Sequence, residues 1–321
     1  MSDEMKPSEN AGDLSSTAVE ASSVGSRVAN DGSELPSPQR LLEELSRLYK
    51  IQPATALWRS VEIAEVLKLG LPEGHGLDLG CGDGALTGLI YRHLKQTPVL
   101  TGLDYSAEEI EIAKRRGIYR DTICGKGDAM PLDDGTFDFV FSNSVLEHIP
   151  ALEGTIAETA RILKRGGSLI ATVPTPTFRE FLRARGRSGA AREAYLEKMD
   201  ARLGHYNYLD EEDWRALLAR HGLRLANSAS YLSQPQVQRW ERLSGLTAGV
   251  LQTLGAGNGM LYRLQRLTRS DGRTAGGLLA GEFRPSAWSR LWAKVVAGSA
   301  LRVEPDQKQG GACLIFRAVK E

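Results

Sequence analysis

Residues 77–84, Leu-Asp-Leu-Gly-Cys-Gly-Asp-Gly, join a short apolar run directly to three closely spaced glycines. The segment that follows, ALTGLIYRHL, has the apolar spacing of a helix. Glycine lets the backbone turn sharply and lets a ligand approach without a Cβ in the way. A buried strand that enters a helix through such a loop is typical of α/β sheets, in which ligands sit beyond the carboxyl ends of the strands.

Six further apolar runs follow, and helical patterns separate several of them, which indicates a mainly parallel sheet. We expect helices over 107–116, 151–163 and 210–221. The predicted fold is a doubly wound, Rossmann-like α/β domain with seven strands, and the run at 311–319 is its last strand. The seven runs read HGLDLGCG, PVLTGLDYS, DTICGKGDA, FDFVFSNS, GSLIATVP, LRLANSASYL and ACLIFRAV.

The chain divides by composition into a tail and one domain. Residues 1–39 are rich in Ser, Gly, Ala and acids, so they lack the apolar surface that would offset the entropy of ordering, and we expect a disordered acidic tail. Residues 40–321 form the predicted domain. Its parts are N-terminal helices at 40–70, a ligand-binding core at 71–174, insertions at 175–208 and 232–307, and the last strand.

Bulk composition excludes several classes of protein. The 321 residues carry no formal net charge, so the chain lacks the long-range attraction to nucleic acid that a basic protein shows. Three scattered cysteines and five dispersed histidines indicate neither a disulfide framework nor a metal site, so no metal is expected. An N-terminus without an apolar run and the lack of a membrane-spanning stretch predict a cytoplasmic protein.

The neutral total hides local charge. The first insertion has seven Lys and Arg against four Asp and Glu, and the second has ten against five. Long insertions in compact domains are usually lids or binding loops. In the second, Trp240, Trp288 and Trp292 lie at helical spacing with Arg284, Arg290, Lys294 and Arg302, which leaves a cover over a substrate, a dimer contact and a peripheral membrane contact open.

Acids at strand ends indicate the kind of ligand. Asp104 ends the second predicted strand, where a carboxylate can accept both hydroxyl hydrogens of a ribose, and Asp128 follows the third, within reach of an exocyclic amine. Dinucleotide sites read G-x-G-x-x-G and hold a pyrophosphate. This loop reads G-x-G-x-G with Asp78 before it and Asp83 within it. Carboxylates repel a pyrophosphate but suit the amino group of methionine, which favours S-adenosylmethionine over a nicotinamide cofactor.

These motifs carry a family resemblance. The runs LDLGCGDG, GLDYS, GDAMPLDDGTFDFVFSNSVLEHIP and ILKRGGSLIATVP resemble the class I methyltransferases of type 11, which include quinone-biosynthesis and natural-product enzymes. The resemblance covers about 77–174 and implies S-adenosylmethionine as the methyl donor. It implies that Asp78, Gly80 and Gly82 flank the methionine part, and that Asp104 binds the ribose. It places Tyr105 on the adenine face, Asp128 with Ala129 at the adenine amine, and Asn143 on the carboxypropyl side.

The sequence says less about the acceptor. Related enzymes that methylate amines often carry N/D-P-P-Y after the fourth strand, where this chain reads Ser142-Asn143-Ser144-Val145, so a small-molecule O- or C-methyltransferase is favoured. The acceptor classes left open are lipids, glycans and aromatic metabolites. His148 and His205 are the candidate catalytic residues, as general base or substrate contact, although His148 could simply shape a helix start. A catalytically silent donor-binding or scaffold protein and a nicotinamide-dependent oxidoreductase remain alternatives.

Overall fold

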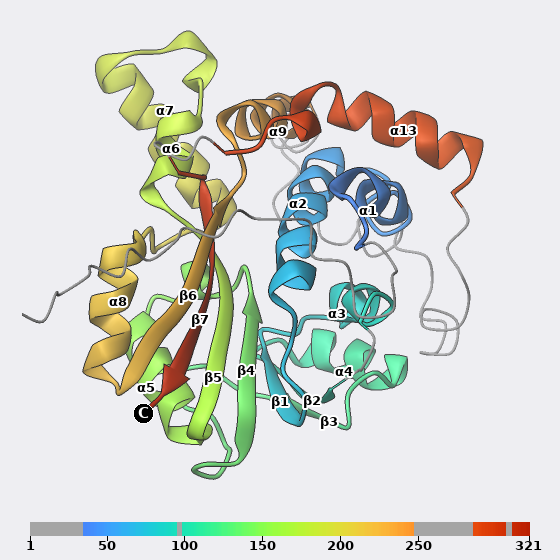
Figure 1. Cartoon of the computed structure of the whole chain (residues 1–321). Helices are drawn as coiled ribbons and strands as arrows, with labels where there is room; N and C mark the ends of the chain where they lie inside the picture. The colour runs from blue at the N-terminus through green and yellow to red at the C-terminus, as the bar shows by residue number, and fades with distance from the viewer. Residues whose placement is uncertain (1–34, 95–97, 247–284, 306–309) are drawn as a thin grey trace, which may run out of the picture. The chain divides into compact units, whose positions relative to one another are not determined.

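Seven strands form one sheet in the order β3-β2-β1-β4-β5-β7-β6 (Figure 1). The computed structural model describes residues 35–94, 98–246, 285–305 and 310–321. Strands β1 to β5 pair in parallel, and β7 is antiparallel to both β5 and β6. The predicted α/β fold with a mainly parallel, seven-stranded sheet is confirmed. The strands are β1 (His75–Leu79), β2 (Val99–Asp104), β3 (Asp121–Cys124), β4 (Phe137–Asn143), β5 (Leu163–Pro174), β6 (Leu223–Tyr231) and β7 (Cys313–Lys320).

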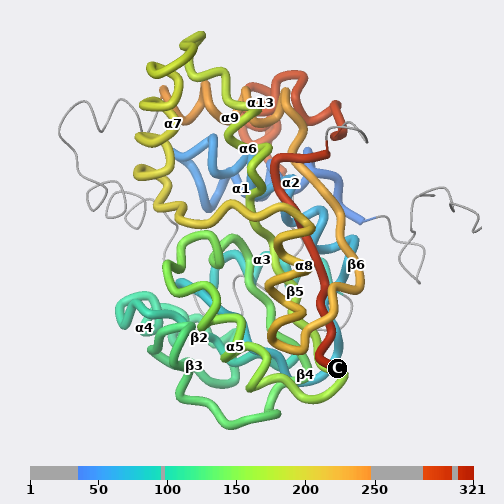
Figure 2. The backbone as a smooth tube through the Cα atoms, turned by 90° about the vertical axis from the view of Figure 1, so that its left-hand side faces the viewer, coloured from blue at the N-terminus to red at the C-terminus, as the bar shows by residue number. Residues whose placement is uncertain are grey.

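Helices cover both faces of the sheet. Successive side chains of a strand point to opposite faces, so β4 places Phe139 and Phe141 in one apolar cluster and Val140 in the other. The first cluster contains buried residues of α1 (Pro38–Leu45), α2 (Pro53–Leu69), α3 (Ala85–Tyr91) and α4 (Ala107–Arg116). The second contains those of α5 (Leu152–Ile162) and α8 (Glu211–Arg220). Figures 1 and 2 show α5 and α8 on the side of the sheet away from α3.

Capping residues explain where the helices on either side of the site begin. Ser106 is the N-cap of α4, and its hydroxyl accepts from the amide of Glu109. Gly117 ends that helix in the left-handed conformation, which glycine adopts at no steric cost. Asp210 caps α8 in the same way through the amide of Asp213. The sequence therefore predicts these helices to within about a residue.

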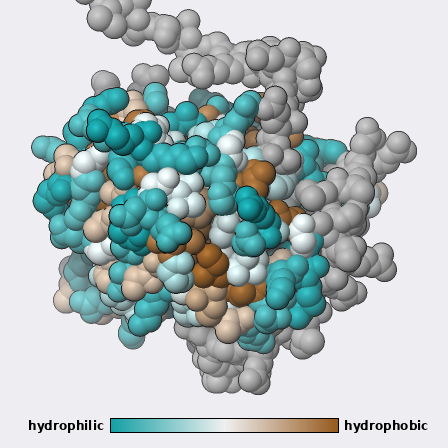
Figure 3. All heavy atoms as spheres, turned by 90° about the horizontal axis from the view of Figure 1, so that it is seen from below, coloured by the Kyte–Doolittle hydropathy of each residue, from teal (hydrophilic) through white to brown (hydrophobic). Residues whose placement is uncertain are grey.

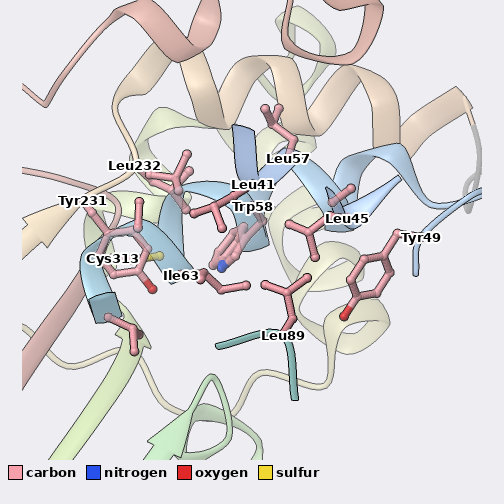
Figure 4. Packing of buried hydrophobic residues seen from close by; sticks show 14 of the residues in the cluster. Leu41, Leu45, Tyr49, Leu57, Trp58, Ile63, Leu89, Tyr231, Leu232 and Cys313 are labelled. Carbon is pink, nitrogen blue, oxygen red and sulfur yellow. The ribbon is translucent and has the colours of Figure 1, made fainter. Parts of the chain in front are cut away.

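The N-terminal helices pack on the end of the sheet where the parallel strands finish. Figure 4 shows leucines of α1 and α2 meeting Tyr231, Leu232 and Cys313, which come from the region of β6 and β7. Trp58 of α2 makes edge contacts with Phe178 and Trp240. These contacts join the N-terminal helices to both insertions, so the core extends beyond the sheet into a helical layer.

The described parts of the two insertions are helical. The first contains α6 (Pro176–Phe181), the 3₁₀ turn η2 (Ala184–Gly186) and α7 (Gly189–Leu203). The second contains α9 (Gln234–Leu246), α13 (Ala287–Ala297) and the 3₁₀ turn η3 (Ala300–Arg302). Figures 1 and 2 show these helices beyond the carboxyl ends of β1, β4 and β5. The predicted tail up to residue 34, the segment 247–284 with Arg284, and 306–309 lie outside the described residues.

The surface differs between the two ends of the sheet. At the end where the parallel strands begin, hydrophilic residues surround a small hydrophobic area (Figure 3). On α13, by contrast, Trp288, Leu291 and Val295 are more than half exposed although the helix also buries Ala293 and Val296. Within the described residues, no helix is both long and apolar enough to cross a bilayer.

Candidate functional site

The glycine-rich loop between β1 and α3 turns through three residues with positive φ. Gly80, Gly82 and Gly84 have φ of 76°, 52° and 74°. The amides of Gly80 and Cys81 both donate to the carbonyl of Leu103 at the end of β2, which fixes the loop to the neighbouring strand. A Cβ on Gly80 would lie 2.5 Å from the methyl carbons of Val145, whereas one on Gly82 would have no atom nearer than 3.9 Å. The open side of the loop is therefore at Gly82.

Asp104 sits between this loop and the start of α4. Its Oδ2 accepts from the amide of Gly82 at 2.9 Å, and its Oδ1 accepts from the amide of Ser106 at 2.9 Å. The side chain is almost buried, and two backbone donors fix its orientation. Each carboxylate oxygen keeps a second lone pair, so Asp104 can still accept hydrogen bonds from a ligand.

Tyr105, Asp128 and Ala129 surround the same end of the sheet. Tyr105 is 82% exposed, as expected of a side chain that offers a ring face to a ligand. Asp128 and Ala129 are exposed in the turn after β3. The amide of Gly125 donates to the carbonyl of Asp104 at 2.9 Å, which ties that turn to the end of β2.

The two acids of the loop point inward. Asp78 is buried, and its Oδ2 accepts from the hydroxyls of Thr87 and Tyr119, both at 2.6 Å. Burial raises its pKa from the usual 3.8 to about 6. Asp83 forms an ion pair with Arg116 at 2.9 Å and accepts from the amide of Ala85. In this structure both acids support the loop from below instead of facing an open space.

Asn143 ends β4 beside a buried acid that our sequence analysis missed. Its Nδ2 donates to Oε2 of Glu62 on α2, 3.0 Å away, and Glu62 is completely buried. The surrounding donors hold the pKa of Glu62 below its usual value, against the effect of burial. The other side chains that donate to Glu62 are Arg59, Ser144, Thr172 and Tyr231.

Arg59 is a second residue that the sequence analysis missed. Its guanidinium pairs with Glu62, which accepts from Asn143 at the end of β4, and the side chain of Arg59 as a whole is about one-fifth exposed. The available signal was the pair of charged residues, three positions apart, inside the apolar helix ALWRSVEIAEVL. A charge on the buried side of such a helix needs a partner.

His148 and His205 come together although they belong to different segments. Their ring centroids are 5.0 Å apart. His148 ends the 3₁₀ turn η1 (Leu146–His148), and His205 follows α7. The amides of Tyr206 and Asn207 donate to the carbonyl of Glu147, which binds the segment after α7 to η1. The structure thus brings the two candidate catalytic residues into one cluster with Glu147.

Burial changes the acid–base properties of this cluster. Glu147 is 2% exposed, and burial raises its pKa to about 8. Burial also lowers the pKa of His148, and it lowers that of His205 to about 3 with help from the neighbouring imidazole. At neutral pH both imidazoles are therefore uncharged, each with one N–H group and one nitrogen that can accept.

Cys81 does not have the environment of a reactive thiol. It is buried in the loop, and burial raises its pKa. Its Sγ lies 2.9 Å from the position that a Cβ on Gly102 would take, so the sulfur fills the space beside that glycine. The thiol is therefore a packing group in the loop.

The chain was compared with models of known protein families. The model of a methyltransferase domain matches residues 77–171, which run from β1 into β5 and include the glycine-rich loop, Asp104, Asp128 and Asn143.

Curated proteins are similar to about a third of the chain, and two of them are described here. An uncharacterized protein of Methanocaldococcus jannaschii is 40% identical over 106 residues, which are 33% of this chain and 47% of that protein. Demethylmenaquinone methyltransferase of Symbiobacterium thermophilum is 31% identical over 118 residues, which are 35% of this chain and 47% of that enzyme. The chain spans about half the length of these relatives.

A solved structure is similar over a longer stretch. It is an S-adenosylmethionine-dependent methyltransferase of Thermotoga maritima, described as a possible histamine N-methyltransferase. The similarity covers 88% of this chain and 97% of that one, at 18% identity and with a TM-score of 0.49.

Proposed function

Residues 77–171 are a methyltransferase domain of class I, the S-adenosylmethionine-dependent kind, and on this premise we propose that the whole chain methylates a small-molecule acceptor at oxygen or carbon. The observation that carries the proposal is the connection of Asp104 to the glycine-rich loop through Gly82. A ribose that is bound by Asp104 has its sugar beside the open side of that loop.

The sheet order supports the placement of the donor. Asp128, Asp104, Gly82 and Asn143 follow or end β3, β2, β1 and β4, which are consecutive neighbours in the sheet. Adenine, ribose and methionine are joined in a line, so each would meet the end of a successive strand. We assign Asp128 with Ala129 to the adenine amine, Tyr105 to the adenine face, Asp104 to the ribose, and Gly80 and Gly82 to the methionine chain.

Asn143 and Arg59 suit the carboxylate end of methionine. Glu62 accepts from both, so the amide and the guanidinium lie at the same place. A guanidinium forms charge-assisted hydrogen bonds with a carboxylate. Asp78 contributes through the loop, because its hydroxyl partners hold it beneath the glycines.

The acceptor is assigned to the cluster of Glu147, His148 and His205. The methyl carbon leaves sulfur as it bonds to the acceptor, and the sulfonium becomes a neutral thioether. When the acceptor is a hydroxyl, its proton must leave, and His148 offers Nε2 to accept it. A base beside the site serves a methyl acceptor that must lose a proton. The presence of His148 therefore favours a phenolic, enolic or similarly acidic substrate over an amine.

The outer face of α13 supports a lipid-like acceptor that is met at an anionic membrane surface. Trp288, Leu291 and Val295 form its exposed apolar stripe, and Arg290 and Lys294 lie exposed beside them. The helix contains no acidic residue. Apolar contact from the stripe and attraction to anionic headgroups would act together.

Calorimetry on the full chain with S-adenosylmethionine and with its demethylated product tests donor binding. Incubation of the protein with methyl-labelled donor and quinols, phenols or glycolipids then tests transfer, read as label in the acceptor. Donor binding without transfer to any of these would support a silent binding protein instead. Absence of donor binding would contradict the proposal outright.

A further inference from the structure

Glu147, His148 and His205 form a group of potential metal ligands. One ligand atom from each lies within 4.8 Å of the others. His148 Nε2 and Glu147 Oε1 are 3.8 Å apart. The side chain of His148 is 42% exposed, so the group opens toward solvent, whereas Glu147 forms its buried base. A group with a buried carboxylate and an open side resembles the three-ligand sites that leave a coordination position free.

Hydrogen bonds define which nitrogen of each imidazole is open. His148 Nδ1 lies 2.9 Å from the carbonyl oxygen of Gly204. A carbonyl only accepts, so Nδ1 carries the proton and Nε2 has a free lone pair. Backbone carbonyls commonly orient metal-binding histidines in this way.

His205 is oriented by a longer relay. Its Nδ1 lies 2.9 Å from the hydroxyl of Tyr208, and that hydroxyl donates to Asp200 at 2.7 Å. Since the tyrosine proton is directed at Asp200, its oxygen accepts from His205 Nδ1. His205 Nε2 is then also unprotonated. A histidine that is hydrogen-bonded through Nδ1 to a carboxylate-linked group is the usual arrangement behind a metal ligand.

Glu147 is the acidic member of the group, and it would bind a cation as the carboxylate. Its Oε2 is buried and has no hydrogen-bond partner among the described residues. A buried carboxylate oxygen without a partner is costly unless a proton or a cation meets it. Arg59 is the cation that faces the cluster, but its guanidinium pairs with Glu62. Either a proton or a second cation is therefore needed to satisfy Glu147.

We propose that Glu147, His148 and His205 bind one Zn²⁺ ion, with an open position for the oxygen of the acceptor. Two imidazoles and one carboxylate are a usual ligand set of catalytic zinc sites, and imidazole prefers transition metals over Mg²⁺. Tetrahedral zinc with bonds of about 2.0 to 2.1 Å needs its ligand atoms roughly 3.4 Å apart, so the three side chains must draw closer. The exposed ring of His148 has room to do so.

The chemical consequence rests on the function proposed above. A hydroxyl that coordinates Zn²⁺ loses its proton to water far more readily, which generates the oxygen nucleophile before methyl transfer. His148 would then act as a ligand, and the metal would replace it as the agent that activates the acceptor. His205 belongs to the insertion after β5 and lies outside the matched residues 77–171.

Metal binding is measured on the untagged full chain, freed of metal with a chelator, by calorimetric titration with ZnCl₂. Cobalt(II) replaces zinc in a second titration, because its visible absorption reports coordination by nitrogen and oxygen. We expect one ion per chain. The double variant His148→Ala, His205→Ala should lose this binding, and Tyr208→Phe should weaken it about tenfold or more because it removes an outer partner. His221→Ala, directly after α8, is the matched control and should bind as the wild type does.

Glu147→Gln retains the size of the side chain and tests the carboxylate if the double variant is unstable. Circular dichroism and donor affinity show whether each variant is folded. A wild-type chain without stoichiometric zinc binding, or equal binding by wild type and double variant, would overturn the proposed site. If zinc binding fails but the donor still binds, the methyltransferase proposal stands. If the wild type does not bind the donor, the methyltransferase proposal fails, and the zinc titration still decides the metal site.

Discussion

The carboxylate of Asp104 is held by the backbone amide of Gly82, with 2.9 Å between Oδ2 and the nitrogen. The position of this carboxylate therefore depends on the conformation of the loop. We expect Asp104→Ala to weaken donor binding by about 10- to 100-fold, because a charge-assisted hydrogen bond contributes about 1.5 to 3 kcal/mol. Calorimetric titration with S-adenosylmethionine measures the change.

Asp133→Ala is the matched control for Asp104, because Asp133 is exposed and precedes β4 at the opposite end of the sheet. Its donor affinity should equal that of the wild type. Equal affinity in Asp104→Ala and wild type would show that the ribose is bound elsewhere.

Alanine substitutions at Gly80 and Gly82 should impair the protein for different reasons. Gly80→Ala places a methyl 2.5 Å from Val145, so we expect a loss of stability of about 2 kcal/mol or more from overpacking and left-handed backbone. Gly82→Ala meets no protein atom nearer than 3.9 Å, so it costs only the backbone term. Its added methyl faces the open side of the loop, and donor binding should fall sharply.

Thermal melts and donor titrations separate these two effects. Gly80→Ala should lower the melting temperature more than Gly82→Ala does. For the same loss of stability, Gly82→Ala should lose more donor affinity than Gly80→Ala. The reverse order would place the donor on the Val145 side of the loop.

The fold and the course of the glycine-rich loop could be predicted because their signals are local. The apolar run before Gly80 and the Ser106 cap each depend on residues within a few positions. The direction of Asp83 could not be predicted in this way. That direction is set by the ion pair with Arg116, the last residue of α4. Arg116 comes close to Asp83 only once the sheet has formed.

The cluster of Glu147, His148 and His205 shows the same limit more strongly. His148 and His205 could be selected singly as polar residues near strand ends, but only the path of the insertion after β5 brings their rings together. The sequence shows Glu62 as a charged residue inside an apolar helix, but it does not show which distant side chains surround it. Its burial depends on Tyr231 and Thr172, which reach it from β6 and β5. Contacts between distant segments carry no signature in a single sequence.

Asp78 should make stability depend on pH. Its pKa is raised to about 6 in the folded protein, so the folded state holds the proton more tightly than the unfolded chain. The contribution of protonated Asp78 is present below about pH 4 and is lost as the pH rises to about 6. Asp78→Asn keeps an oxygen for Thr87 and Tyr119, and should gain about 2 to 3 kcal/mol relative to wild type across that range.

Urea unfolding of the unliganded protein at pH 4, 5, 6 and 7 measures this difference. Asp133→Asn, an exposed acid, should show the wild-type dependence. A constant difference between Asp78→Asn and wild type at all four pH values would mean that Asp78 does not titrate in this range.

The buried acid Glu62 should be a major stabilising residue. Glu62→Gln replaces an acceptor oxygen by an NH₂ group, which would face the donors of Arg59 and Asn143. Removing one charge of a buried pair costs about 3 to 5 kcal/mol. Tyr231→Phe removes one of several donors to Glu62 and should cost only about 1 to 2 kcal/mol.

Chemical denaturation compares the two variants at constant pH. The donors that surround Glu62 lower its pKa, so its contribution is present above the unfolded pKa and decreases as the pH falls. The gap between wild type and Glu62→Gln should therefore narrow in acid. If Glu62→Gln is as stable as Tyr231→Phe at neutral pH, the cluster does not depend on the charge.

The exposed stripe on α13 should bind anionic membranes. Trp288 is 70% exposed and Val295 62%, and Lys294 lies exposed between them in the sequence. Burial of the apolar side chains at a bilayer surface and attraction of Lys294 to headgroups both favour binding. The double variant Trp288→Ala, Lys294→Glu should reduce flotation with phosphatidylglycerol vesicles, and raised salt should weaken flotation of the wild type.

Lys114→Glu on α4 makes the same charge change on an exposed residue and should float as the wild type does. Equal flotation of wild type and double variant would assign the exposed stripe to something other than a membrane. Unchanged donor affinity in the double variant would show that any loss of flotation is local to α13.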